Sequence, residues 1–200
     1  MPAESPRPVA GVVLAAGASK RFGRNKLLLT LDGASLARRA ATTALAAGLS
    51  PVVVVLGYEA DAIARELSGL PVHPVVNADY ERGMSTSLAA GIMAVGSEAD
   101  AAVVLLADMP RVTAAMVGRL VEERRRTGAP LVASDYEGVQ APPTLYARTL
   151  FPELGGPEGD GSGKRVVRRH EAEAVRVRWP AAALTDVDRE EDWQMQEISE

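Results

Sequence analysis

The sequence predicts an α/β fold, in which a mostly parallel sheet carries helices on both faces. Short, bounded apolar runs rich in valine alternate with alanine-rich or amphipathic segments of helical length. Hydrophobic residues make up 47% of the chain and aromatic residues only 4%, so alanine, valine and leucine must build the core. A chain of 200 residues is long enough for one domain with a substantial core. We expect a flexible start at residues 1–8 and a single domain over residues 9–200.

Strands are predicted where a short apolar run is bounded by polar or turn residues, a pattern typical of buried parallel strands. In chain order they span residues 9–15, 52–56, 72–76, 100–107, 131–134 and 174–177, with a short strand at 185–188. Helices are predicted where alanine-rich or amphipathic segments follow these strands. They span residues 35–47, 58–67, 85–94, 113–127, 164–170 and 189–198. Gly48 and Gly128 are predicted to stop helices, and Thr113 to cap one.

Two prolines decide the prediction for residues 139–147. Pro142 and Pro143 interrupt this run, and proline has no N–H to donate to a central ladder. We therefore expect residues 139–147 to form an edge strand or an extended loop.

Composition excludes several classes of protein. A formal net charge of −4 gives no electrostatic case for general nucleic-acid binding. The chain has no cysteine, which excludes disulfides, thiolate metal sites and cysteine nucleophiles, and its two histidines exclude a histidine-rich metal site. No apolar run approaches membrane-spanning length, and residues 1–8 lack the apolar core of a signal peptide. We expect a cytoplasmic protein that binds neither membranes nor nucleic acid.

The loop after the first predicted strand is the strongest functional signal. It contains Gly17 and Gly23, and within seven residues it carries four cations, Lys20, Arg21, Arg24 and Lys26. Glycine lets backbone N–H groups approach an anion closely, and lysine and arginine supply the charge that polyphosphate needs. The alternative is an ordinary strand exit with a solvated basic surface, but this density of cations favours phosphate binding. The spacing of the glycines fits neither the P-loop nor the dinucleotide-binding fingerprint.

Three segments are predicted to meet at one edge of the sheet. Ligands of such sheets bind at the carboxyl ends of the strands, and the basic loop, residues 77–87 and Asp108 all lie at such ends. Asp108 follows a long apolar strand, where a carboxylate is well placed to hold Mg²⁺ together with substrate phosphates. A helix-capping or turn role is the ordinary alternative for a lone aspartate.

A resemblance to a known family rests on the first loop. Leu14-Ala15-Ala16-Gly17, Ser19, Arg21-Phe22-Gly23 and Lys26 match the signature L-A-A-G-x-S-x-R-F/M-G-x-x-K of the MobA-like nucleotidyltransferases. Asn77–Leu88, with Tyr80 in place of the usual tryptophan, Asp108-Met109-Pro110, Gly159–Arg165 and Thr185–Asp192 resemble further family segments in the family's order. The resemblance implies a single-domain Rossmann-like fold of the nucleotide-diphospho-sugar transferase type.

The resemblance also implies which residues form the site. It implies catalytic roles for Arg21, Lys26 and Asp108. It implies nucleotide binding by Leu14, Ala15, Ala16, Gly17, Ser19, Lys26, Asn77, Gly83, Met84, Ser85 and Ser87. It implies a metal site at Asp108 completed by Asp186 or Asp188, with helix capping as the alternative for Asp188. The implied acceptor-binding residues are Asp160, Lys164 and Arg165, although the two cations also suit a solvated basic helix.

The implied activity is Mg²⁺-dependent nucleotidyl transfer, in which an acceptor phosphate attacks a nucleoside triphosphate and pyrophosphate leaves. Ala16 favours CTP, because the cytidylyl branch has L-A-A-G and the guanylyl branch L-A-G-G. The implied acceptor is molybdopterin in its molybdenum-loaded form, and the implied protein partner a molybdoenzyme or its chaperone. The cytidylyl branch usually has G-H-P where this chain has residues 139–143 without histidine, which concerns the acceptor more than the reaction.

Several alternatives stay open from the sequence. The chain could be a guanylyltransferase or a sugar-phosphate or other cytidylyltransferase of the same fold. It could also be a small-molecule oxidoreductase on this scaffold, or a non-catalytic chaperone that delivers cofactor. Release of pyrophosphate would identify a transferase, and consumption of NAD(P)H an oxidoreductase.

Overall fold

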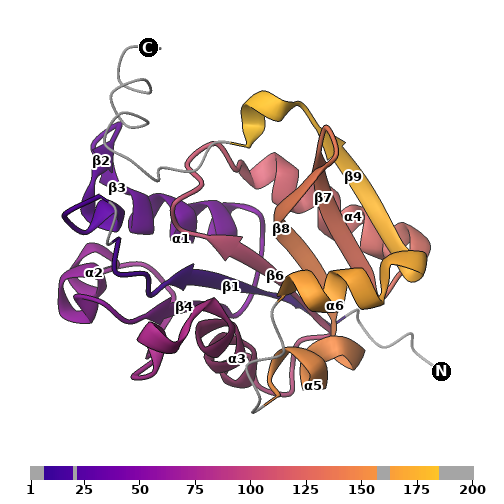
Figure 1. Ribbon diagram of the computed structural model, residues 1–200, viewed down its shortest axis with the longest axis horizontal. Coiled ribbons are helices and arrows are strands. Elements are labelled where there is room, and N and C mark those ends of the chain that lie inside the picture. The colour runs from indigo at the N-terminus through magenta and orange to yellow at the C-terminus, as the bar shows by residue number, and fades with distance from the viewer. Residues whose placement is uncertain (1–6, 20–21, 157–162, 185–200) are drawn as a thin grey trace.

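A computed structural model describes residues 7–19, 22–156 and 163–184, and its centre is a seven-stranded sheet (Figure 1). The strand order is β5-β4-β1-β6-β8-β7-β9, and every pair except those made by β8 is parallel. The strands are β1 (Val9–Ala15), β4 (Val52–Leu56), β5 (His73–Val76), β6 (Ala101–Leu106), β7 (Leu131–Tyr136), β8 (Val139–Ala147) and β9 (Ala174–Trp179). The mostly parallel α/β fold predicted from the sequence is confirmed.

The prediction of an edge position for β8 is wrong, because β8 lies between β6 and β7. Only residues 144–147 of β8 pair with β6, so Pro142 and Pro143 lie beyond the end of that ladder. On the other side, the register with β7 shifts between Ala133 and Asp135, opposite the two prolines. A central strand tolerates the prolines here because neither ladder needs their missing N–H groups.

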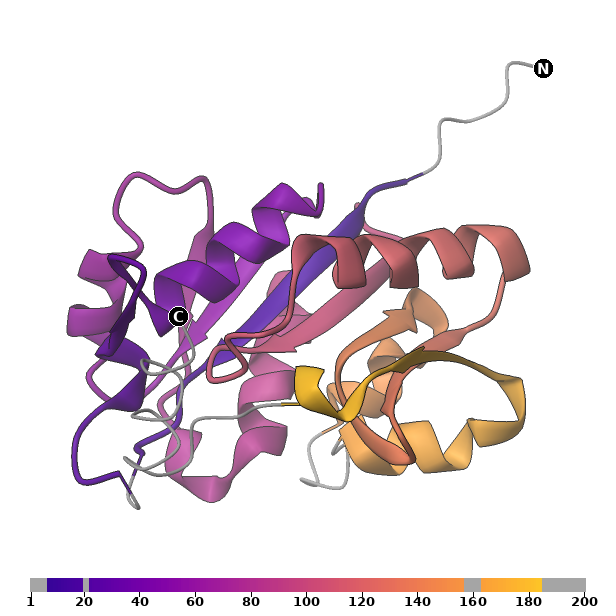
Figure 2. The ribbon, with the colours of Figure 1, turned by 90° about the horizontal axis from the view of Figure 1, so that it is seen from above.

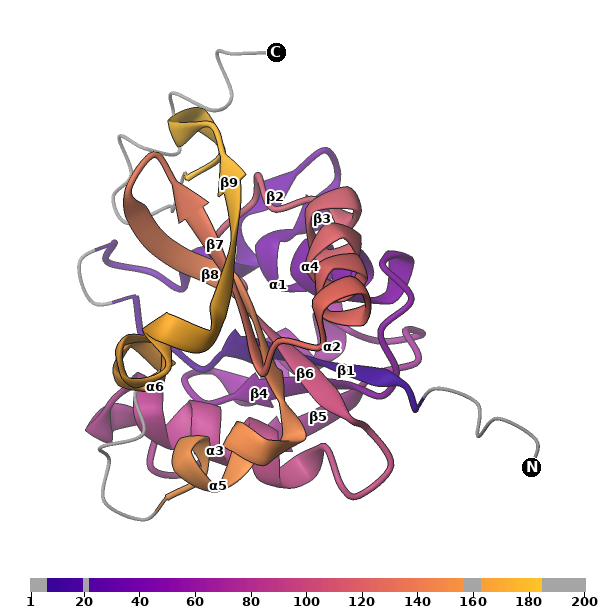
Figure 3. The ribbon, with the colours of Figure 1, turned by 90° about the vertical axis from the view of Figure 1, so that its right-hand side faces the viewer.

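Six α-helices of the described residues cover the two faces of the sheet. One face is covered by α1 (Leu36–Ala46), α2 (Ala60–Glu66) and α4 (Ala114–Thr127), and the other by α3 (Met84–Ala94), α5 (Phe151–Leu154) and α6 (Gly163–Arg169). Figure 3 shows α4 and α6 on opposite sides of the sheet, and Figure 2 shows the length of α4 along its face. Successive side chains of β1 point to opposite faces of the sheet and contribute to both cores. Val13 packs on the α1 side and Val12 on the α3 side.

Short elements complete the described chain. A small antiparallel hairpin, β2 (Thr30–Leu31) and β3 (Ala34–Ser35), precedes α1. The single-turn 3₁₀ helices are η1 (Lys26–Leu28), η2 (Tyr80–Arg82), η3 (Arg148–Leu150), η4 (Glu171–Glu173) and η5 (Ala181–Ala183). The predicted strand at 185–188 and helix at 189–198 lie outside the described residues. No described helix is long and apolar enough to cross a membrane.

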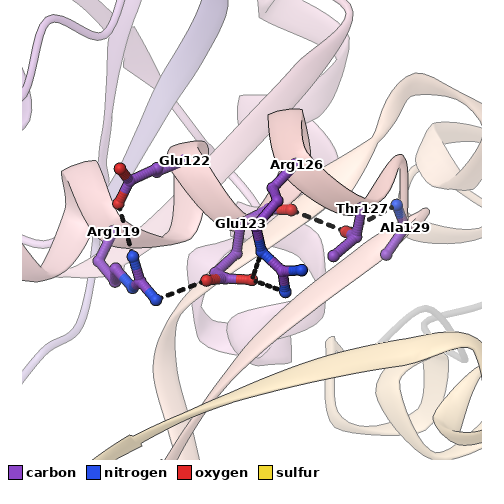
Figure 4. Close-up of polar contacts among 6 residues, drawn as sticks. All are labelled: Arg119, Glu122, Glu123, Arg126, Thr127 and Ala129. Atoms are coloured by element: carbon purple, nitrogen blue, oxygen red, sulfur yellow. Dashed lines mark hydrogen bonds and ion pairs between the residues drawn. The ribbon is translucent and has the colours of Figure 1, made fainter.

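Helix ends follow the capping signals in the sequence. The Thr113 side chain accepts a hydrogen bond from the backbone N–H of Met116, and Gly128 ends α4 in the left-handed conformation, as predicted. Helix α4 also carries an ion-pair cluster in which the buried Glu123 contacts the exposed Arg119 and Arg126 (Figure 4). The hydrogen bond from Arg126 and the charges of both arginines lower the pKa of Glu123.

Glycine brings α3 close to the sheet. A Cβ at Gly91 would lie 2.4 Å from Val12 Cγ1 and 2.9 Å from Val55 Cγ2, nearer than packed carbon atoms approach. Gly91 therefore sets the spacing between α3 and strands β1 and β4. This spacing positions the start of α3 beside the ends of those strands.

An ionic cluster links α5 to α6. Glu153 contacts the Arg169 guanidinium at 2.6 Å and His170 Nε2 at 2.8 Å, and Glu173 contacts His170 Nδ1 at 3.4 Å. The hydrogen bond to Glu153 raises the pKa of His170, with a smaller contribution from Glu173. The hydrogen bonds from His170 and Arg169 lower the pKa of Glu153.

Candidate active site

A cavity of about 230 Å³ lies where β1 and β6 end. Because these two strands are parallel neighbours, the residues that follow them meet at the same edge of the sheet. The cavity is lined by residues at or just after the ends of β1 and β6, by η1, by η2 and by the start of α3. The lining residues are Leu14, Ala16, Gly17, Lys26, Leu27, Tyr80, Met84, Ser87, Leu106 and Asp108. The structure thus brings the basic loop, residues 77–87 (the middle loop) and Asp108 together around one space.

The two charged groups of the cavity form an ion pair. Lys26 Nζ lies 2.7 Å from Asp108 Oδ2, and the exposed fractions of the two side chains are only 12% and 23%. Attraction between the charges is stronger at such a partly buried place than at an open surface, because less water screens it. The cavity therefore holds an ammonium group and a carboxylate side by side.

Local hydrogen bonds fix the backbone of Lys26. The Lys26 N–H donates to Ser19 Oγ at 3.2 Å, and the Asn25 side chain accepts from the Leu27 N–H at 3.1 Å to cap η1. Ser19 has φ of 48°, in the left-handed region that serine seldom adopts. Ser19 Oγ therefore helps to hold the loop around Lys26, and its contact with a nucleotide stays a prediction.

The middle loop is organised by the side chain of Asn77, which is only 7% exposed. Its Nδ2 donates to Thr86 Oγ1 at 2.9 Å and to Ser87 Oγ at 3.0 Å, while its Oδ1 accepts from the Asp79 N–H at 3.0 Å. Asn77 itself does not line the cavity. It ties the end of β5 to the first turn of α3 and thereby positions Ser87, which does line it.

Gly57, which the sequence analysis did not single out, joins the two loops. A Cβ at this position would lie 2.7 Å from the Ala16 carbonyl oxygen and 2.7 Å from Tyr80 Cβ. Without a side chain, the end of β4 lets Tyr80 approach the loop that follows β1, and the Tyr58 N–H donates to the Ala16 carbonyl at 3.2 Å. The available signal was a glycine directly after a predicted strand, next to the two candidate loops.

Some predicted site residues are described but do not line the cavity. Ala15 points to the α1 side of the sheet, and Gly83 and Ser85 lie at the start of α3 outside the cavity. Lys164 and Arg165 lie on the first turn of α6 and are also outside it. Leu27, Tyr80 and Leu106 line the cavity although the predicted set did not include them.

Other predicted site residues cannot be placed. Arg21, Asp160, Asp186 and Asp188 lie outside the described residues. Within residues 7–19, 22–156 and 163–184, no group of three or more histidine, cysteine, aspartate and glutamate side chains could hold a metal ion. The described part of the metal site predicted from the sequence is therefore Asp108 alone.

The chain is similar to known proteins over most of its length. Purine catabolism protein PucB of Bacillus subtilis is 32% identical over 197 residues, covering 92% of this chain and 94% of PucB. Nicotine blue oxidoreductase of Paenarthrobacter nicotinovorans is 34% identical over 80% of this chain and 81% of that protein. A probable molybdenum cofactor guanylyltransferase of Opitutus terrae is 32% identical over 69% of this chain and 66% of that protein.

A solved structure and a family description agree with these relatives. Rv0371c of Mycobacterium tuberculosis superposes with a TM-score of 0.85 at 26% identity, covering 96% of this chain and 98% of that one. Residues 11–175 match the MobA-like NTP transferase domain, a range that includes the basic loop, the middle loop and Asp108. The chain therefore belongs to the MobA-like NTP transferase family.

Proposed function

We propose that this nucleotidyltransferase moves a nucleoside monophosphate from a triphosphate, CTP, to a phosphate-bearing acceptor and releases pyrophosphate. The observation that supports the proposal best is the cavity in which Gly17 of the basic loop, Lys26 and Asp108 lie together. Phosphoryl-type transfer needs alignment and neutralisation of charge rather than covalent help from the protein. These residues supply both requirements at one place.

The transfer is a substitution at the α-phosphorus. An oxygen of the acceptor phosphate forms a new bond to that phosphorus, the bond to the bridging α–β oxygen breaks, and the electron pair leaves with pyrophosphate. Gly17 lines the cavity without a side chain, so its backbone leaves room for a phosphate to approach. Lys26 supplies positive charge to the phosphates, and the predicted role of Arg21 is the same.

The residues present fit a divalent cation of the magnesium type. Asp108 offers a hard carboxylate oxygen inside the cavity, and Mg²⁺ is commonly held by one or two carboxylates together with substrate phosphates. When bound, such a cation neutralises charge on the phosphates. Rv0371c has also been solved in complex with manganese, another divalent cation. Asp186 or Asp188 remains our proposal for a second carboxylate.

Selection of CTP is proposed from Ala16. Its side chain is buried and lines the cavity, whereas the guanylyl form of the motif has glycine at this position. A methyl group beside the base or ribose limits which nucleotide fits. Steric exclusion of this kind is typically worth about 1–3 kcal/mol, which gives a preference and not absolute selection.

For the acceptor we propose molybdopterin in its molybdenum-loaded form. The supporting observations are the resemblance of the first loop and the Opitutus relative, which is named for the molybdenum cofactor. A molybdoenzyme or its chaperone is the proposed protein partner, and we propose a cytoplasmic location. A small-molecule oxidoreductase is a second candidate, because the nicotine blue oxidoreductase is 34% identical over four fifths of the chain.

One assay separates these functions. The purified protein is incubated with Mg²⁺, each of the four nucleoside triphosphates and a set of candidate acceptors, and pyrophosphate is measured. We expect release with CTP and molybdenum-loaded molybdopterin, and its loss in Asp108→Asn. Consumption of NAD(P)H with a small-molecule substrate, without pyrophosphate, would favour the oxidoreductase. The absence of pyrophosphate release with every combination would contradict the proposed transfer.

A further inference from the structure

The ion pair between Lys26 and Asp108 has a consequence for metal binding. Lys26 Nζ is 2.7 Å from Asp108 Oδ2 inside the cavity, with both side chains largely buried. Under the proposed function, the same ammonium group contacts triphosphate and the same carboxylate contacts a divalent cation. While Lys26 and Asp108 contact each other, Lys26 cannot fully contact triphosphate and Asp108 cannot fully contact a divalent cation.

A cation that joins Asp108 while Lys26 is in place meets an unfavourable charge arrangement. One carboxylate oxygen already accepts from the ammonium group, and the other oxygen lies on the same small group. The two cations would share the Asp108 carboxylate at short range, where their mutual repulsion is poorly screened because the pair is partly buried. Full binding of a divalent cation therefore requires the ammonium group to move away.

The backbone of Lys26 is held in place, whereas its side chain can change conformation. Ser19 Oγ holds the Lys26 N–H, and the Asn25 cap holds the next residue of η1. The four-carbon stem can turn its ammonium group between neighbouring acceptors while this backbone stays fixed. Triphosphate in the same cavity carries several negative charges and offers the ammonium group a stronger partner than a single carboxylate.

We propose that Lys26 occupies the metal-binding carboxylate in the nucleotide-free protein and leaves it when triphosphate binds. Triphosphate then removes a competitor of the metal, and metal removes a competitor of triphosphate for Lys26. By linkage, each ligand raises the affinity of the other by the same factor. This inference rests on the proposed function for the identity of both ligands.

The test measures Mn²⁺ binding without nucleotide, by titration calorimetry or by the loss of the free-ion electron paramagnetic resonance signal. Lys26→Gln removes the competing charge at similar length, so we expect Mn²⁺ to bind roughly fivefold more tightly than to wild type. Lys26→Arg retains the charge and should keep wild-type affinity. A gain from losing a lysine is not expected of a residue with a merely structural role.

Arg119→Gln is the matched control for the change in net charge. Arg119 lies in the ion-pair cluster of α4, and Glu123 keeps Arg126 as a partner when Arg119 is removed (Figure 4). This variant also loses one positive charge, together with its ion pairs to Glu122 and Glu123, but Arg119 does not line the cavity, so its Mn²⁺ affinity should equal that of wild type. Thermal unfolding of each variant checks that the fold is retained, and Lys26→Met replaces Lys26→Gln if the latter does not fold.

The competition between Lys26 and the metal, and the metal site itself, are refuted by different results. If Lys26→Gln binds Mn²⁺ no more tightly than wild type, or if Arg119→Gln gains as much, the competition is refuted while the proposed transfer stands. If Asp108→Asn binds Mn²⁺ as well as wild type, the metal site of the proposed function is itself wrong. A gain in Lys26→Gln together with a loss in Asp108→Asn supports the competition.

Discussion

Replacement of Gly17 by alanine should separate folding from nucleotide binding. No described atom lies within 4 Å of the position that a Cβ would take at Gly17, and this glycine does not have the positive φ that would strain another residue. The folded state therefore accepts the methyl group, and the reduced freedom of the unfolded chain should stabilise the protein by about 0.4–1 kcal/mol. The methyl group, however, occupies the cavity where phosphate would approach the backbone. Crowding of a filled site by one carbon typically costs about 1–3 kcal/mol, which raises Kd by about fivefold to 150-fold.

The assay compares the free energy of unfolding in denaturant with the affinity for CTP in the presence of Mg²⁺. Gly118→Ala is the control, because Gly118 lies within α4 and also has no described atom within 4 Å of its Cβ position. Both variants should be as stable as wild type or more stable, and only Gly17→Ala should bind CTP weakly. Unchanged CTP affinity in a folded Gly17→Ala protein would refute phosphate binding by this loop.

Three further changes test the site and the fold. Asp108→Asn should keep the fold but lose metal-dependent turnover by roughly a hundredfold or more, and a near-normal kcat would contradict its role. Ala16→Gly should admit GTP without excluding CTP, which is measured as the ratio of the two kcat/KM values with one acceptor; an unchanged ratio would locate selectivity elsewhere. Because Glu153 raises the pKa of His170, their pair stabilises the fold most below the ordinary histidine pKa of about 6.5, and this contribution fades as pH rises through the raised pKa. The lowered pKa of Glu153 means that the contribution persists on acidification until that carboxylate is protonated. The difference in unfolding free energy between wild type and His170→Asn should therefore be larger at pH 6 than at pH 9, and equal differences would contradict this.

The features that the sequence predicted well depend on local patterns. The valine-rich run of β1, the glycine stop at Gly128 and the cap at Thr113 are each encoded within a few residues. The meeting of Lys26 and Asp108 followed from a rule about parallel strands, because both residues lie beyond the carboxyl ends of neighbouring strands.

The features that escaped prediction depend on contacts between distant segments. The central place of β8 requires the ladders of β6 and β7 to end at its prolines, and nothing in residues 139–147 alone reveals this. Likewise, the inward side chain of Asn77 and the approach of Tyr80 to Gly57 appear only once the strands are assembled. Sequence pattern identified the loop that carries these residues, but not which of them hold the loop and which line the cavity.

The hydrogen bonds of Asn77 have a consequence for the thermodynamics of ligand binding. The loop before α3 receives its shape from one buried amide that bonds Thr86, Ser87 and the backbone of Asp79. The conformational entropy of ordering this loop is therefore lost when the chain folds, and little of it remains to be lost when a nucleotide arrives. Association with this side of the cavity should consequently be fast and need little rearrangement, with discrimination between nucleotides expressed in how quickly they leave.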